Sequence, residues 1–84
     1  HHNNNFHKIQ APMIGTFYQS SEPEAKAFVK VGDPVSKGDI LCIIEAMKMM
    51  NQIECDVDGT IERILVQNGD PVEYDEVLFL ISQN

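Results

Sequence analysis

The sequence predicts an all-β domain, a flattened β-sandwich of two similar four-stranded halves related by a pseudo-two-fold axis. Three observations support this prediction: a repeat within the chain, short runs of β-forming residues, and turn residues between those runs. A chain of 84 residues with 43% hydrophobic residues has material for one core. We therefore expect one domain over residues 6–84 and a tag or linker remnant at residues 1–5 (HHNNN).

The repeat is clearest around a Gly-Asp-Pro turn. Residues 31–35 (VGDPV) return as residues 68–72 (NGDPV), at an offset of 37 residues. At the same offset, residues 40–44 (ILCII) lie over residues 77–81 (VLFLI). Two similar halves in so small a chain favour two short sheets that face each other, because one half alone would leave its apolar face uncovered.

A second match locates an insertion in the first half. Gly15-Thr16-Phe17 corresponds to Gly59-Thr60-Ile61, at an offset of 44 residues instead of 37. The first half therefore holds seven additional residues, which lie between Phe17 and Val29. The simplest interpretation of this insertion is a polar surface loop.

The repeated segments have the composition of turns and strands. Gly32 tolerates positive φ and Pro34 fixes its own φ near −65°, so the Gly-Asp-Pro segments predict turns. The runs 40–44 and 77–81 are rich in β-forming residues and too short for ordinary helices. Periodicity alone leaves residues 60–66 open to a strand or a helix. Glycines at both ends of that segment favour a strand with a turn at each end.

Residues 45–50 (EAMKMM) join the two halves. Their composition alone is compatible with a helix, but the position at the junction favours a hairpin with Met47 and Lys48 at its tip. Two-residue hairpins prefer Asn-Gly because both positions need positive φ. Placing Met and Lys there costs about 1–3 kcal/mol of backbone strain. A surface point that breaks a local rule in this way indicates function.

Lys48 is expected to be a substrate and not a catalyst. A nucleophilic lysine needs burial or neighbouring cations to lose its proton. The nearest charged residue is Glu45, which favours the ammonium form. Another protein must therefore activate and modify this amine.

Composition excludes several other functions. The net charge of −7, from 13 acidic and 6 basic residues, argues against nucleic acid and suits docking on basic patches of partner proteins. No apolar run is long enough to span a membrane. Cys42 and Cys55 are expected to be reduced core thiols, and their mutual contact is left open. No Ser/His/Asp grouping, phosphate loop or metal-ligand spacing is present, and His7 is expected to be a surface or partly packed residue.

Ala46-Met47-Lys48-Met49, at the midpoint of a two-fold-repeated β domain, resembles the attachment motif of the biotinyl domain family. Further segments are similar to the carrier domains of bacterial-type acetyl-CoA carboxylases: residues 11–18 (APMIGTFY), 25–29 (AKAFV) and 43–53 (IIEAMKMMNQI). The resemblance covers residues 7–81. It implies the biotinyl/lipoyl-like fold, a barrel-sandwich hybrid, with biotin in amide linkage to Lys48.

The family resemblance also gives the insertion a meaning. Acetyl-CoA carboxylase carriers have a protruding segment near the biotin, which here would be the thumb loop, residues 19–24 (QSSEPE). The family commonly has a Pro-Ser pair where this chain has Ser21 and Glu22, so the chain departs from the family pattern at these two positions. The alternative is an ordinary polar loop without function.

The resemblance implies a non-catalytic carrier subunit. Biotin protein ligase would attach the biotin, biotin carboxylase would load it, and carboxyltransferase would unload it to form malonyl-CoA for fatty acid biosynthesis. Biotin contacts would come from Met47, Met49, Ser20 and Ser21. Glu45 and Ala46 would serve recognition, although Glu45 could equally be a solvated strand end. The expected location is the bacterial cytoplasm or the plastid stroma.

Two alternatives remain: a lipoyl domain, and an adaptor module whose lysine is not modified. A lipoyl domain shares the fold and the hairpin lysine, but typically has Asp before that lysine and Ala after it, and lacks the thumb. Met47, Met49 and the insertion argue against it. An unmodified adaptor module would gain no mass at Lys48.

Overall fold

The computed structural model describes residues 5–83, which form eight strands and no helix. The strands are β1 (His7–Gln10), β2 (Gly15–Tyr18), β3 (Pro34–Val35), β4 (Ile40–Ala46), β5 (Met49–Glu54), β6 (Gly59–Ile64), β7 (Pro71–Val72) and β8 (Val77–Gln83). Of the predicted tag or linker, residues 1–4 lie outside the described residues, and Asn5 is exposed ahead of β1. The strand alternative for residues 60–66 is correct over β6.

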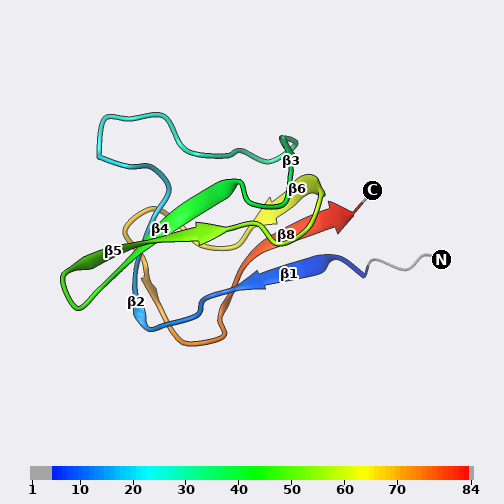
Figure 1. The fold of residues 1–84 in the computed structure, drawn as a ribbon. Coiled ribbons are helices and arrows are strands. Elements are labelled where there is room, and N and C mark those ends of the chain that lie inside the picture. Colours follow the sequence, from blue (N-terminus) through cyan, green and yellow to red (C-terminus); the bar gives the residue numbers. More distant parts are fainter. Residues whose placement is uncertain (1–4, 84) are drawn as a thin grey trace.

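The strands form two four-stranded antiparallel sheets that pack face to face (Figure 1). One sheet has the order β1-β8-β6-β3 and the other β5-β4-β2-β7. Each sheet therefore takes two strands from each half of the chain, so neither half makes a sheet of its own. This exchange ties the halves into one core. The all-β sandwich prediction is confirmed.

Backbone contacts repeat at the two offsets found in the sequence. Gly15 of β2 lies against β4, where an added Cβ would come 2.4 Å from the carbonyl oxygen of Glu45. Gly59 of β6 lies against β8 in the same way, 2.4 Å from the carbonyl oxygen of Ser82. The two glycines are 44 residues apart and the two carbonyls 37. The pseudo-two-fold relation is thus present in the close approach of the strands.

The Gly-Asp-Pro turns also match each other. Gly32 and Gly69 have φ of 95° and 90°, the left-handed region that glycine adopts without a steric penalty. The carboxylate of Asp33 accepts a hydrogen bond from the backbone N–H of Lys30 at 2.9 Å. Its counterpart Asp70 accepts the equivalent bond at 2.9 Å. These aspartates are acidic residues with a structural role, because each closes a turn.

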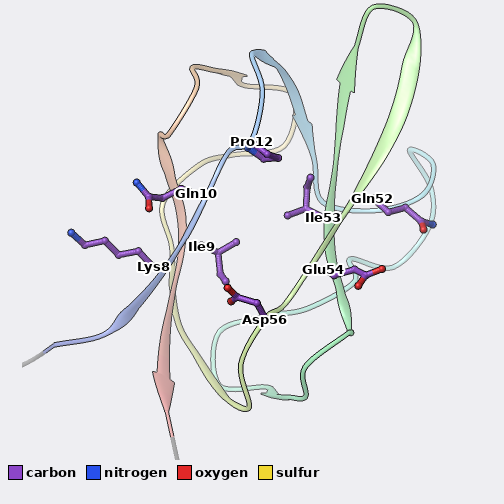
Figure 2. Close-up of a pocket in the computed structure, with 8 residues that line it drawn as sticks. All are labelled: Lys8, Ile9, Gln10, Pro12, Gln52, Ile53, Glu54 and Asp56. Atoms are coloured by element: carbon purple, nitrogen blue, oxygen red, sulfur yellow. The ribbon is translucent and has the colours of Figure 1, made fainter.

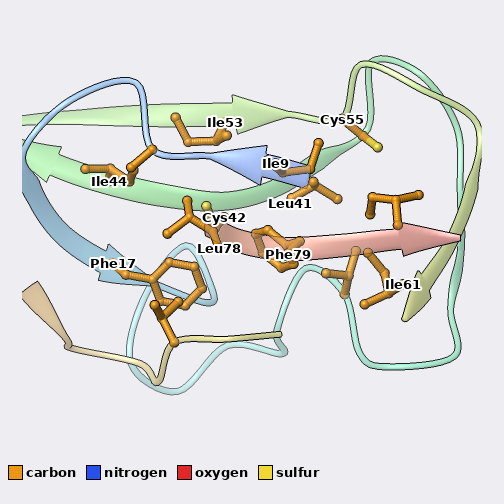
Figure 3. Packing of buried hydrophobic residues seen from close by; sticks show 14 of the residues in the cluster. Ile9, Phe17, Leu41, Cys42, Ile44, Ile53, Cys55, Ile61, Leu78 and Phe79 are labelled. Carbon is orange, nitrogen blue, oxygen red and sulfur yellow. The ribbon is translucent and has the colours of Figure 1, made fainter. Parts of the chain in front are cut away.

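The core lies between the sheets and draws on both halves (Figure 3). Phe17 of β2 and Phe79 of β8 meet at its centre, with ring centroids 6.0 Å apart. Cys42 and Cys55 are buried and free, and their side chains lie in different parts of the core (Figure 3). Burial raises the pKa of the Cys42 thiol to about 12. Both thiols therefore lie in the core, as predicted.

A hollow of about 470 Å³ lies where the edge strands β1 and β5 face each other (Figure 2). Figure 2 shows Ile9 and Ile53, which are 44 residues apart, between the two strands. The half-buried ring of His7 bridges this seam through Nε2, 2.8 Å from Oδ1 of Asp56. The hollow contains no residue of the 45–50 hairpin. It is a seam of the pseudosymmetric sandwich and lies apart from Lys48.

Candidate functional site

Residues 45–50 form a hairpin, and the helix alternative for this segment is wrong. Ala46 pairs with Met49, which leaves Met47 and Lys48 as the two turn residues. Their φ angles are 51° and 65°, so both adopt the left-handed conformation expected of a tight hairpin. Figure 1 shows the β4–β5 hairpin projecting from one end of the sandwich, away from the start of β1 and the end of β8.

The tip exposes apolar side chains around one amine. Met47 is 94% exposed, and Met49 and Met50 are also exposed. Lys48 is exposed beside them. The flexible, polarisable thioether of methionine adapts to surfaces of different shape. Side chains of this kind gain little from packing here, so their placement suits contact with other proteins.

The base of the hairpin is rigidly held. The β4–β5 ladder runs from Ala46/Met49 back to Ile40/Glu54, and β2 pairs with β4 as far as Glu45. The side-chain amide of Asn51 donates to the carbonyl oxygens of Ile44 at 3.1 Å and of Met49 at 3.3 Å. Beyond the Glu45/Met50 pair the hairpin continues for only one more pair of residues before the turn. A mobile lysine side chain is therefore mounted on a stiff support.

The thumb loop (residues 19–24) follows β2 and is closed by local hydrogen bonds. The backbone N–H of Phe28 donates to the carbonyl oxygen of Gln19 at 2.8 Å, which closes the loop at its base. The Ser20 hydroxyl donates to the carbonyl oxygen of Glu22 at 2.8 Å. The backbone N–H of Gln19 donates to Oδ1 of Asn68 at 2.8 Å, which ties the loop to the second half. These hydrogen bonds close the loop at its base and join it to the second half of the chain.

Ile43 is buried although it is not part of the core cluster. Strand alternation places Ile44 in the core and Ile43 on the opposite face of β4. Ile43 is nevertheless only 5% exposed. Its repeat counterpart Leu80, in the half without the insertion, is only partly buried. We infer from this difference that the inserted segment, between Phe17 and Val29, shields the outer face of β4.

A hollow of about 310 Å³ lies between the thumb loop and the hairpin. Predicted site residues Ser20, Ser21 and Glu45 line it. Met47, Lys48, Ala46 and Met49 do not line it and form the adjoining tip. Ser20 is 5% exposed and its hydroxyl is already used within the loop, so Ser21 is the better placed of the two serines to contact a ligand. The structure therefore brings the tip and the loop together at one end of the domain.

Tyr18, Met50 and Asn68 also line the hollow, and sequence reasoning did not assign them to the site. Glu22 and Pro23 line it as well; they belong to the predicted thumb loop but were not singled out as site residues. Tyr18 precedes the predicted loop and Met50 follows the predicted tip, and the two-residue turn pairs Met50 with Glu45 across the hairpin, which places both side chains on one face. Asn68 belongs to the second half, in the turn before Gly69, and nothing in the local sequence connects it with the loop.

Within residues 5–83, no helix is long and apolar enough to cross a membrane. Over the same residues, no cluster of three His, Cys, Asp or Glu side chains has the arrangement of a metal site.

Comparison with known proteins gives a family match and several similar proteins. The family described as biotin-requiring enzymes matches residues 7–81. The chain is 62% identical over 73 residues to the biotin carboxyl carrier protein of acetyl-CoA carboxylase from Pseudomonas aeruginosa, covering 87% of this chain and 47% of that protein. It is 57% identical over 75 residues to the protein of the same name from Haemophilus influenzae, covering 89% and 48%. The chain spans about half the length of these relatives.

Solved structures give the same fold. Urea carboxylase from Kluyveromyces lactis superposes with a TM-score of 0.79 at 28% identity, over 98% of this chain and 7% of that one. A single-chain, multi-domain long-chain acyl-CoA carboxylase superposes with a TM-score of 0.81 at 20% identity, over 100% of this chain and 8% of that one. The second likeness supports the fold alone.

Proposed function

The chain belongs to the family of biotin-requiring enzymes, and from that premise we propose that it is the biotin carboxyl carrier domain of an acetyl-CoA carboxylase. The observation that carries the proposal is the strained, exposed Met47-Lys48 turn on a rigid hairpin beside an ordered loop. Biotin is held by an amide to Nζ of Lys48. The domain carries a carboxyl group between two enzymes and catalyses neither step.

The residues of this end of the molecule fit a biotin group. Lys48 is exposed on the tip, where a ligase can reach its amine. The adjoining hollow of about 310 Å³ falls at the lower end of the size range of small-molecule sites. It combines the apolar surfaces of Tyr18 and Met50 with the polar groups of Ser21 and Asn68. When bound, biotin supplies a ring nitrogen that accepts and releases the carboxyl group.

The residues of the hairpin present Lys48 to the partner enzymes. Lys48 is the residue that biotin protein ligase modifies, and its exposure on the tip leaves the amine accessible to that enzyme. Met47 and Met49 offer adaptable apolar contacts to each partner in turn. Glu45 and Ala46, half-buried at the end of β4, are placed beside the tip where a partner enzyme can recognise them.

A fixed support and a flexible arm together serve two enzymes. The lysine stem and the attached group can sweep a volume around the tip, while the hairpin and the sandwich stay rigid. Tethering keeps the group at high effective concentration near biotin carboxylase and then near the carboxyltransferase. We infer that the setting is fatty acid biosynthesis in the bacterial cytoplasm or the plastid stroma, and similar proteins include a bacterial carrier protein and one named chloroplastic from Arabidopsis thaliana.

Intact mass spectrometry after coexpression with a biotin ligase tests the attachment. We expect one added biotin, absent from Lys48→Arg, which keeps the positive charge and removes the primary amine. Lys37→Arg, a matched change at another exposed lysine, should still gain biotin. An unmodified wild-type protein under saturating biotin and active ligase would refute the proposal.

Deleting residues 19–24 tests the role of the thumb loop. We expect the deletion to preserve the fold and biotinylation, and to alter carboxylation by biotin carboxylase. Exposing Ile43 should lower the free energy of unfolding by about 1–2 kcal/mol. Ile43→Val, which keeps the loop and loses about 1 kcal/mol, is the stability control and should be carboxylated normally. If the deletion variant does not fold, the loop is a structural element and this assignment is wrong.

A further inference from the structure

Two glutamates and no cationic residue line the hollow beside the tip. Glu22 belongs to the thumb loop and Glu45 to β4. The remaining lining residues are Tyr18, Ser20, Ser21, Pro23, Met50 and Asn68, all uncharged. Across residues 5–83 the only ion pair joins His7 and Asp56, on the distant seam. Neither glutamate is therefore neutralised by a described neighbour.

Attachment of biotin removes the nearest positive charge on the hairpin. Lys48 lies three residues from Glu45 and two from Met50 along the hairpin. An ammonium at that position offsets the carboxylates, but an amide nitrogen carries no charge. Once Lys48 is modified, the hollow faces the arm with two uncompensated negative charges.

The cargo that the arm carries is itself an anion. A carboxyl group on the ring nitrogen is ionised at neutral pH, whereas the unloaded ring is neutral. Like charges at close range repel, and the repulsion is stronger between a loop and a strand than in bulk water, because part of the solvent is displaced. Any contact between arm and hollow must therefore weaken on loading.

We propose that the hollow distinguishes the two states of the arm by charge: it holds the unloaded ring and expels the loaded one. This inference rests on the proposed function. The unloaded arm is kept against the domain through contacts with Tyr18, Met50 and Ser21. Addition of the carboxyl group frees the arm to reach the carboxyltransferase. Glu22 and Glu45 are the residues that impose the difference.

NMR of the full domain labelled with ¹⁵N tests the proposal without an activity assay. Intact mass first establishes one biotin on Lys48, which tests the proposed function separately. The amide signals of Ser21 and Asn68 then report docking, as shifts between unmodified and biotinylated protein. We expect these shifts with the neutral arm. We expect the ratio of docked to free arm to fall at least about threefold when biotin carboxylase, ATP and bicarbonate load it.

Two controls separate charge from size. An arm that carries the methyl ester of the same carboxyl group has the added volume without the charge, and should remain docked. In the double variant Glu22→Gln, Glu45→Gln, the loaded arm should remain docked as well. Raising the salt concentration to about 1 M should reduce the difference between loaded and unloaded arms in the wild type.

Several outcomes would overturn the inference. One is a loaded arm that gives the same Ser21 and Asn68 shifts as the unloaded arm. Another is an ester that undocks like the acid, because size would then be the cause. A double variant that still expels the loaded arm would remove Glu22 and Glu45 from the mechanism. A biotinylated protein without any shift at these amides would exclude docking, and the mass result would leave the carrier function standing.

Discussion

At the scale of single residues, the tip of the hairpin combines backbone strain with exposed apolar side chains. Met47 and Lys48 have φ of 51° and 65°, where glycine and asparagine are the usual occupants. The sequence predicted both the turn and its positive φ angles, because the two residues fall at the junction of the repeat. Met47 and Lys48 at these positions lower the stability of the fold, and the turn that they form presents Lys48 to solvent.

Replacing Met47 with asparagine should stabilise the domain. Asparagine tolerates the left-handed region better than methionine, so we expect Met47→Asn to raise the free energy of unfolding by about 0.5–1 kcal/mol. Urea denaturation measures this change. Met49→Asn is the matched control: it is an exposed strand position, where asparagine is disfavoured, and the same substitution should be neutral or destabilising. Equal effects at both sites would contradict the strain at Met47.

Cys42 gives the domain a specific sensitivity to alkaline pH. Burial raises its pKa from 9.0 to about 12. Between these values the unfolded chain loses the thiol proton and the folded chain keeps it. Stability from this group is complete below pH 9 and is lost as pH rises toward 12, by about 1.4 kcal/mol per pH unit. Urea denaturation across this range should show that extra slope in the wild type and not in Cys42→Ala. Parallel curves would refute the assignment.

At the scale of elements, the repeat places two glycines at the closest approaches between strands. Gly15 allows β2 to lie against β4, and Gly59 allows β6 to lie against β8. The sequence marked both as equivalent through Gly15-Thr16-Phe17 and its counterpart. It did not reveal the partner strands, since a repeat establishes which positions are equivalent and not which strands pair. The exchange of strands between the sheets therefore emerged only from the structure.

Adding one methyl group at either glycine should force its strands apart. An alanine Cβ would lie 2.4 Å from a backbone carbonyl oxygen in both cases. We expect Gly15→Ala and Gly59→Ala each to lower the free energy of unfolding by about 1–3 kcal/mol, measured by chemical denaturation. Only Gly15→Ala displaces the strand that leads to Lys48, so it alone should also slow biotinylation. Slowing by both variants would show that general loosening, and not local displacement, controls access to the tip.

At the scale of the whole molecule, the offsets predicted the outline of the site but not its interior. The change from 44 to 37 residues located the insertion, and the junction located Lys48. The hollow between them depends on how an irregular loop folds, which periodicity does not encode. Asn68 illustrates this, because its contact with the backbone of Gln19 joins residues 49 positions apart.

The net charge of −7 should accelerate encounter with the ligase. Salt shortens the reach of electrostatic attraction from about 10 Å at 0.1 M to about 3 Å at 1 M. We expect kcat/KM for transfer of biotin to the domain to fall about tenfold over that range, with little change in kcat. Activation of biotin by the ligase alone, without the domain, provides the salt control.

Two single substitutions separate a field of the whole molecule from a local contact. Glu45→Gln removes a charge beside the tip, and Glu62→Gln removes an exposed charge on β6 of the other sheet. If the summed charge steers the encounter, both variants should lower kcat/KM at low salt by a similar factor and reduce its salt dependence equally. If only Glu45→Gln lowers kcat/KM, the ligase contacts the Glu45 carboxylate directly. In that case the remaining acidic residues serve turns, as Asp33 and Asp70 do, and solubility.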